Sequence, residues 1–153
     1  MTKRILGYWF YGHSGVGKTF AAKYLRKKII KSLSVDGDEI RKNISKDLDY
    51  NIKDRIIQIQ RTIGICKIII NNNYFPIVSS GYMNSKSLNL IKKNNILVFK
   101  IERDSKFAMK KNPIYKLKKN IIGKDIKIKK LNTQIIFNSG DKKFINELKK
   151  LII

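Results

Sequence analysis

One glycine-spaced segment near the start of the chain constrains the fold more than any other feature of the sequence. It reads Gly12-His13-Ser14-Gly15-Val16-Gly17-Lys18-Thr19, follows an apolar, strand-like run at 5–11 and opens a helix-like run. Glycines let successive backbone N–H groups curl around phosphate oxygens, while the lysine reaches the β- and γ-phosphates and the threonine hydroxyl can bind Mg²⁺. The order of strand, loop and helix predicts a P-loop with the ATP-binding residues Gly12, Ser14, Gly15, Val16, Gly17, Lys18 and Thr19.

The rest of the chain alternates strand-like and helix-like runs. With 153 residues, 42% of them hydrophobic, it can bury one core, so we expect a single domain over 1–153. The alternation predicts an α/β fold, a P-loop NTPase-type parallel sheet flanked by helices on both faces. We expect strands at 5–11, 32–35, 75–79, 96–101 and 134–137. We expect helices at 18–31, 53–72, 85–93, 104–110 and 141–151, the first with an inward stripe of Phe20, Ala21, Tyr24 and Leu25.

A lysine-crowded stretch at about 110–130 shows little periodicity and contains Gly123. Such a stretch next to a phosphate site is a candidate mobile lid. Its lysines Lys110, Lys111 and Lys116 could neutralise the transferring phosphates when the lid is closed. His13, inside the P-loop, is expected to fill space at a position that requires little of its side chain.

The formal net charge of +23 suggests nucleic acid as a partner, but lysine is spread over the whole chain together with asparagine and isoleucine. That spread is typical of a compositional bias, and no basic stripe with interleaved aromatics appears. We therefore expect no dedicated nucleic-acid partner. Lys or Asn interrupts every apolar run, so no membrane partner is expected either. The single cysteine, Cys66, lies among isoleucines and is expected to be buried, which fits a cytoplasmic protein without disulfides.

A second constellation, Asp36-Gly37-Asp38-Glu39-Ile40-Arg41, follows the second expected strand. Ligands gather at the carboxyl ends of parallel strands, and two carboxylates beside a phosphate loop can serve phosphoryl transfer. One of Asp36 and Asp38 would hold Mg²⁺ with Thr19, and the other would orient or deprotonate an attacking hydroxyl. An Asx turn that caps the next helix could account for one of the two. The predicted catalytic residues are Lys18, Asp36 and Asp38, with Thr19 and Asp36 at the metal.

Arginine is rare in this lysine-rich chain, with six residues, and three of them lie between 41 and 61. A planar guanidinium grips phosphate with a fork that lysine lacks. We expect this role for Arg41 and Arg55 ahead of Arg61, because solvated helix faces keep arginines too. Tyr50 is placed to stack on a base, although an aromatic residue there could equally fill the core.

These residues together resemble the motifs of the adenylylsulphate kinase family, in the same order along the chain. The resemblance rests on the P-loop followed by Asp36-Gly37-Asp38-Glu39-Ile40-Arg41, Asp47-Leu48-Asp49-Tyr50, Asp54-Arg55 and Arg61. It implies phosphorylation of the 3′-hydroxyl of a small nucleotide by ATP with Mg²⁺, on a P-loop kinase fold that often forms homodimers. It also implies the acceptor-binding residues Asp38, Arg41, Tyr50, Arg55, Gln58, Ser80, Gly81 and Tyr82.

The sequence departs from the family pattern on the acceptor side. Gln58 stands where the family usually has Asn, and Gln60 replaces an Arg. After the third strand, Gly81-Tyr82-Met83-Asn84 replaces Ile-Ser-Pro-Tyr, and Lys111-Asn112-Pro113-Ile114-Tyr115-Lys116 is a shortened form of the family's lid motif. Two alternatives therefore stay open. One is the same reaction on another nucleotide, such as cytidine diphosphoramidate, and the other is a non-enzymatic, nucleotide-gated nucleic-acid-binding protein.

Overall fold

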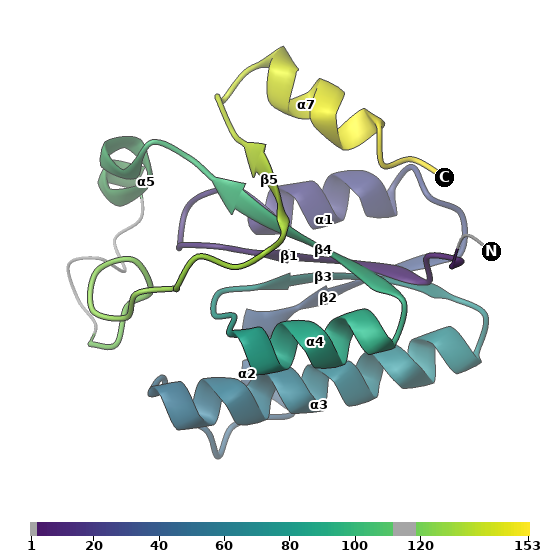
Figure 1. Ribbon diagram of the computed structural model, residues 1–153, viewed down its shortest axis with the longest axis horizontal. Coiled ribbons are helices and arrows are strands. Elements are labelled where there is room, and N and C mark those ends of the chain that lie inside the picture. Colours follow the sequence, from purple (N-terminus) through teal and green to yellow (C-terminus); the bar gives the residue numbers. More distant parts are fainter. Residues whose placement is uncertain (1–2, 112–118) are drawn as a thin grey trace.

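Five parallel strands form one sheet within residues 3–111 and 119–153, which the computed structural model describes (Figure 1). They are β1 (Gly7–Tyr11), β2 (Ser32–Asp36), β3 (Phe75–Ser80), β4 (Ile96–Glu102) and β5 (Gln134–Phe137). Their spatial order is β2-β3-β1-β4-β5, so the chain passes from β1 to the edge strand β2, returns to β3 beside β1 and then moves to the other side of β1. A crevice forms outside the carboxyl end of the strand where the order switches. This end of β1 leads into the glycine-rich loop.

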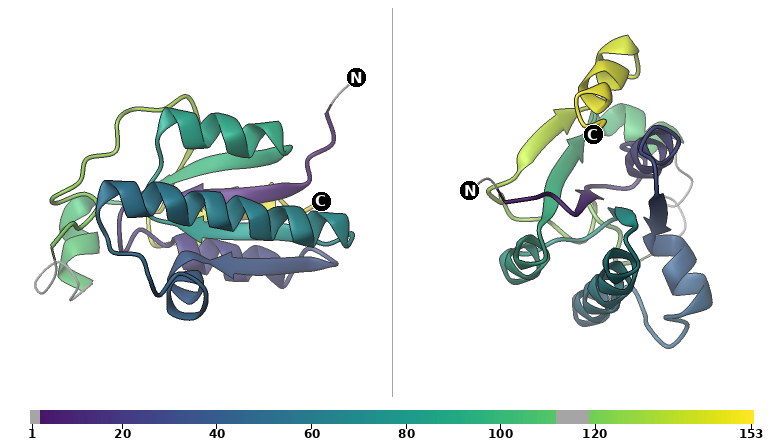
Figure 2. Two further views of the ribbon diagram at one scale, coloured as in Figure 1. Left: turned by 90° about the horizontal axis from the view of Figure 1, so that it is seen from below. Right: turned by 90° about the vertical axis from the view of Figure 1, so that its right-hand side faces the viewer.

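Helices cover both faces of the sheet, which confirms the predicted α/β architecture. On one face lie α1 and α7, and on the other α3 and α4, with α2 beside α3 (Figures 1 and 2). The described helices are α1 (Lys18–Arg26), α2 (Gly37–Asn43), α3 (Ile52–Asn71), α4 (Ser85–Lys93), α5 (Ser105–Lys111) and α7 (Lys142–Lys149). None of the helices in the described ranges is long and apolar enough to span a bilayer.

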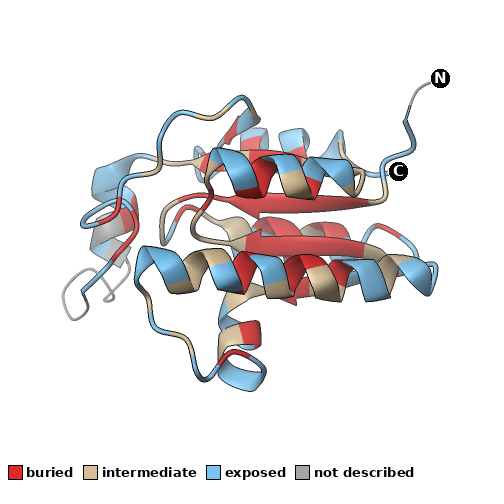
Figure 3. Cartoon of the chain, turned by 60° about the horizontal axis from the view of Figure 1, so that its bottom comes forward, coloured by how far each residue is buried: buried red, intermediate tan, exposed pale blue. Residues whose placement is uncertain are grey.

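The core has two halves, one on each side of the sheet, and β1 contributes to both. All five residues of β1 are buried, because the strand is flanked by strands on both sides and by helices on both faces. Tyr8 and Phe10 pack toward α1 and α7, while Trp9 and Tyr11 pack toward α3 and α4. Figure 3 shows the same layering, with buried residues along the strands and on the inner sides of the helices. Cys66 is fully buried in the second half, as predicted.

The first helix differs from the prediction. It ends at Arg26 rather than at 31, because the Ser32 hydroxyl donates hydrogen bonds to the carbonyls of Arg26 and Ile29 and fixes a tight turn there. The expected inward residue Phe20 is 51% exposed, whereas Ala22 is buried with Ala21 and Leu25. Tyr24 is only partly buried.

Other element boundaries are close to the predictions, with one addition. Helix α3 begins one residue earlier and ends one residue earlier than the expected 53–72. Helix α2 was expected only as the helix that an Asx turn might cap. It begins directly after β2, where the Asp36 carboxylate accepts a hydrogen bond from the Asp38 backbone N–H and caps the helix.

The burial pattern of α1 can be tested by two truncations on the same helix. Leu25→Ala should lower the free energy of unfolding by about 2–5 kcal/mol, because it opens a cavity in the core. Phe20→Ala should cost no more than about 1 kcal/mol, since half of its side chain is already in solvent. Urea unfolding measures both values. Equal losses would contradict this assignment of the inner face.

Candidate active site

The glycine-rich loop has a backbone that only glycines can supply at several positions. Gly12 and Gly17 have φ values of 149° and 102°, where L side chains are strained. A Cβ atom would also lie 2.4 Å from the Ile101 carbonyl oxygen at the first position and 2.5 Å from Asn138 Nδ2 at the second. The loop is therefore held close to the ends of β4 and β5. Its shape is fixed by packing as well as by glycine content.

Asn138 holds the loop through a side-chain hydrogen bond. The sequence analysis did not identify this residue. It lies directly after β5, is 6% exposed, and donates from Nδ2 to the Val16 carbonyl oxygen at 2.8 Å. Its Oδ1 accepts from the Gly140 backbone N–H at 2.9 Å. A polar residue directly after a strand was the only signal in the sequence.

Lys18 extends across the loop toward the aspartate pair. Its ammonium donates to the His13 carbonyl oxygen. Burial lowers the pKa of Lys18, and the negative charges of Asp38 and Asp36 raise it in part, because they favour the ammonium form. The resulting pKa is about 8. The lysine is thus partly desolvated and close to both carboxylates. A phosphate placed in the loop would raise the pKa of Lys18 again, because its negative charge favours the ammonium form.

Asp36 joins three segments through its carboxylate. Oδ2 accepts hydrogen bonds from the hydroxyls of Thr19, at 2.9 Å, and Ser79, at 2.8 Å, while Oδ1 accepts from the Asp38 backbone N–H at 2.9 Å. Burial raises the pKa of Asp36, but the hydrogen bonds outweigh it, so the pKa lies below the usual value and the group is ionised. The predicted metal residues Thr19 and Asp36 therefore meet directly.

The oxygens of Thr19 and Asp36 suit Mg²⁺, which binds through one or two protein oxygens together with phosphates and water. Among residues 3–111 and 119–153, no group of three His, Cys, Asp or Glu side chains could form a metal site made of protein ligands alone. The donor set fits a metal that arrives with a nucleotide.

A cleft of about 240 Å³ opens beside the loop and brings most of the predicted residues together. The predicted residues that line it are Ser14, Gly15, Lys18, Thr19, Asp36, Asp38, Arg41, Tyr50, Arg55, Gln58, Ser80, Gly81 and Tyr82. Gly12, Val16 and Gly17 belong to the loop but do not line the cleft. The lining residues that the sequence analysis did not name are Gly37, Ile59, Ser79, Lys119, Asn120, Ile121 and Ile122.

The two arginines of the cleft are fixed by backbone carbonyls. Arg41 donates from Nη1 to the carbonyl oxygens of Leu48, at 3.1 Å, and Asp49, at 2.8 Å. Arg55 donates from Nε to the Tyr50 carbonyl oxygen at 2.7 Å. Burial, followed by the charge of the nearby Arg41, lowers the pKa of Arg55 to about 10. Two cations held this close together leave a site that favours an anion.

Tyr50 lines the cleft together with these arginines. The guanidinium carbon of Arg41 is 4.3 Å from the centre of its ring, and that of Arg55 is 5.5 Å away. Arg61 is placed differently, since it does not line the cleft and forms a two-pronged ion pair with Asp47 at 2.6 and 2.7 Å. The structure therefore separates Arg41 and Arg55 from Arg61, in the order that the sequence analysis favoured.

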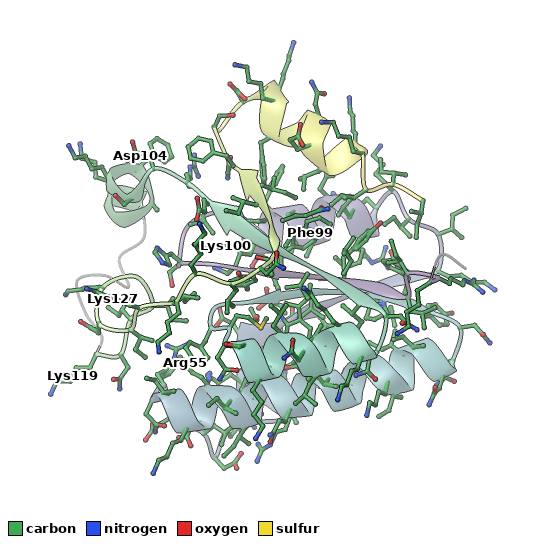
Figure 4. The ribbon with its side chains drawn as sticks, in the orientation of Figure 1. Arg55, Phe99, Lys100, Asp104, Lys119 and Lys127 are labelled. Carbon is green, nitrogen blue, oxygen red and sulfur yellow. The ribbon has the colours of Figure 1, made fainter. Side chains whose placement is uncertain are left out.

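A turn at 121–126 contributes Ile121 and Ile122 to the wall of the cleft. Ile121, Ile122 and Ile126 are buried, and Arg55 Nη2 donates to the Asn120 carbonyl oxygen at 2.8 Å. In Figure 4 Arg55 points toward the segment that carries Lys119 and Lys127. The turn belongs to the stretch predicted to be a lid, and one of its lysines, Lys119, lines the cleft.

Two glycines let this turn pack closely against the segment after β3 and against the P-loop. A Cβ atom on Gly81 would lie 2.6 Å from Ile122 Cδ1, and one on Gly123 would lie 2.7 Å from His13 Nδ1. Burial lowers the pKa of His13, and the neighbouring Lys100 and Lys18 add to this. His13 thus packs against the turn, in keeping with its expected role as a space-filling residue.

The three lysines predicted for the lid can be placed only in part. Lys110 is exposed on α5. The side chain of Lys111 and the whole of Lys116 lie outside the described residues.

Comparisons with known proteins agree on one family. The sequence model of the family described as adenylylsulphate kinase matches residues 5–117. An adenylyl-sulfate kinase of Buchnera aphidicola is 28% identical over 159 residues, covering 94% of this chain and 77% of that protein. A probable adenylyl-sulfate kinase of Pseudomonas aeruginosa is 38% identical over 69 residues, covering 42% of this chain and 32% of that protein.

Solved structures show the same fold. The Mycobacterium tuberculosis APS kinase CysC, in complex with AMPPNP and APS, superposes with a TM-score of 0.81 over 97% of this chain and 96% of that chain, at 16% identity. The protein APE1195 gives a TM-score of 0.78 at 17% identity, over 97% of this chain and 93% of that one. At this level of identity the likeness concerns the fold alone.

The lowered pKa of Lys18 makes a prediction for nucleotide binding. Above pH 8 the free protein holds a neutral Lys18, and the phosphates of ATP will bring the ammonium form back. ATP binding should therefore take up a proton, and affinity should fall by up to about tenfold per pH unit above that value. Calorimetry of Mg²⁺–ATP binding in buffers of different ionisation enthalpy measures this uptake. Lys18→Arg, which stays charged, should lack it; an unchanged proton uptake in this variant would rule Lys18 out.

Proposed function

Because the chain belongs to the adenylylsulphate kinase family, a family of ATP-dependent phosphotransferases, we propose that it transfers the γ-phosphoryl group of ATP to the 3′-hydroxyl of adenylylsulphate. One observation supports this most directly. A single cleft is lined by residues of the P-loop, by Arg41, Tyr50 and Arg55, and by Asp36 and Asp38. A donor phosphate and an acceptor anion can thus meet beside a base.

The P-loop end would hold the triphosphate. Backbone N–H groups of the loop and the Lys18 ammonium supply positive potential where charge accumulates on the γ-phosphoryl group. Thr19 and Asp36 would hold Mg²⁺, which neutralises charge on the β- and γ-phosphate oxygens when it is bound. Lys18 already lies close to both aspartates, so the loop needs little rearrangement before transfer.

Asp38 is the better candidate for the base. Both oxygens of Asp36 already accept hydrogen bonds, from Thr19 and Ser79 on one side and from the Asp38 backbone N–H on the other. Asp38 would accept the proton of the attacking hydroxyl while the hydroxyl oxygen forms its bond to the γ-phosphorus. The bond from that phosphorus to the bridging oxygen then breaks, and ADP leaves with the bond's electron pair.

The other end of the cleft would hold the acceptor. Arg41 and Arg55 present cations to the anionic part of adenylylsulphate. Tyr50, Ile121 and Ile122 line the same region and offer apolar surface for the base. The family membership favours this acceptor over cytidine diphosphoramidate and over a purely nucleic-acid-binding role, and both alternatives enter the test.

The proposal is tested by mass analysis of the products from ATP, Mg²⁺ and a panel of acceptors. Adenylylsulphate should gain one phosphoryl group, while cytidine diphosphoramidate and RNA should not. Lys18→Ala should lower turnover by about 100-fold or more and change acceptor binding little, because its partner is the migrating group. Lys23→Ala, an exposed lysine on the same helix, is the matched control and should leave turnover unchanged. Phosphorylation of another acceptor alone would overturn the proposal.

A second test concerns the acceptor end. Arg55→Lys keeps the charge but loses the fork that bonds two carbonyls and reaches the cleft, so the KM for adenylylsulphate should rise by about tenfold. Arg61→Lys makes the same chemical change outside the cleft and should leave this KM unchanged. Steady-state kinetics at saturating ATP compare the two. Equal effects would remove Arg55 from the acceptor site.

A further inference from the structure

Strand β5 forms one edge of the sheet and carries two apolar side chains that are largely in solvent. It pairs with β4 along one side, and the sheet ends there (Figure 2). Ile136 is buried in the half of the core that contains Phe144 and Leu148 of α7. Its neighbours Ile135 and Phe137 point to the opposite face of the strand, and each is 56% exposed.

The same two residues carry the free hydrogen-bonding groups of this edge. The Asn138 backbone N–H donates to the Glu102 carbonyl oxygen of β4 at 2.7 Å. Successive residues of a strand direct their N–H and C=O groups to opposite sides, so Ile136 faces β4 as Asn138 does. Ile135 and Phe137 therefore direct theirs away from β4, and within the described residues no hydrogen bond to these groups is found.

Edge strands are usually protected by a charged residue or a proline on the strand, or by a segment that covers them. The strand Gln134-Ile135-Ile136-Phe137 contains neither charge nor proline. At the other edge of the sheet, α1 and α2 both contact β2, and β2 ends in the carboxylate of Asp36. Strand β5 is therefore the edge that is open to another strand.

The charges around β5 indicate what kind of strand would pair with it. Residues 127–143 carry five lysines and one aspartate, and all five lysines are exposed. Two copies of a chain with a net charge of +23 would repel each other at this edge. A nucleic acid would match the charge, but it has no row of amide donors and carbonyl acceptors to pair with a strand. An acidic polypeptide matches both the charge and the backbone.

We propose that β5 is a docking edge for an extended, acidic segment of a partner protein, which adds one strand to the sheet. The backbone of that segment would pair with the free N–H and C=O groups of Ile135 and Phe137. Its apolar side chains would cover the exposed side chains of these two residues, and its carboxylates would face the lysines at 127–143. This surface lies outside the cleft, so the inference goes beyond the proposed function.

The probe is a short fluorescent peptide in which glutamate alternates with valine, and its binding is measured by fluorescence anisotropy. It should bind the unmodified protein with a Kd of about 100 μM or tighter. The same peptide with every backbone nitrogen methylated cannot donate to a strand and should bind at least about tenfold more weakly. A version with lysine in place of glutamate should be weakened by at least about tenfold as well.

Two variants of β5 locate the binding site. Ile135→Pro removes the outward N–H and leaves the bonds to β4 in place, since proline is tolerated on that side of an edge strand, and it should weaken binding by about tenfold or more. Ile135→Asp should do the same by repelling the peptide and removing apolar surface. Ile30→Asp makes the identical change at an isoleucine that is 88% exposed elsewhere, and it should change the Kd by less than about twofold.

Several results would overturn the inference. Equal binding of the methylated and unmethylated peptides would show that no strand is added, and this comparison does not depend on the folding of any variant. Equal affinities of Ile135→Asp and Ile30→Asp would place the peptide elsewhere on the protein. Sedimentation of the unmodified protein as a dimer that Ile135→Asp dissociates would make a second copy the occupant. Single-stranded RNA that binds in place of the peptide and is lost in Ile135→Asp alone would make the partner a nucleic acid.

Discussion

The carboxylate of Asp36 is the interaction on which the site depends. It ends β2, caps α2, and accepts hydrogen bonds from Thr19 at the start of α1 and from Ser79 near the end of β3. Three segments distant in the sequence are thereby joined at one point. Parallel strands place their carboxyl ends at the same edge of the sheet, and this carboxylate uses that geometry to align the phosphate loop with the aspartate pair. The ionised state of Asp36 follows from the donors around it rather than from exposure.

Around this point the two ends of the cleft are built by different means. The phosphate end depends on backbone, because glycines allow the loop to approach β4 and β5, and Asn138 holds it from beneath. The acceptor end depends on side chains, since Arg41 and Arg55 are held in place by carbonyl oxygens and confine Tyr50. A backbone cradle tolerates little change, whereas a wall of side chains can be altered one residue at a time. The departures from the family pattern are correspondingly concentrated at the acceptor end.

The turn at 121–126 shows how such departures depend on one another. Gly81 leaves space for Ile122, and Gly123 leaves space for the His13 ring, so the turn packs against both the end of β3 and the phosphate loop. The sequence analysis named both glycines, but nothing in the sequence indicated that they are points of close packing. The contact pairs bridge about forty and over one hundred residues respectively, and only the folded chain brings them together.

The sequence by itself determined the succession of strands and helices along the chain, the phosphate loop, and the residue types of the cleft, because these depend on local spacing and periodicity. The central strand, α3 and the preference for Arg41 and Arg55 over Arg61 could all be predicted in this way. Only the tertiary structure decided the exposure of Phe20, the support by Asn138 and the place of β5 at the edge of the sheet. Each of these is set by a partner on another element, and a pattern along one segment carries no information about what packs against it.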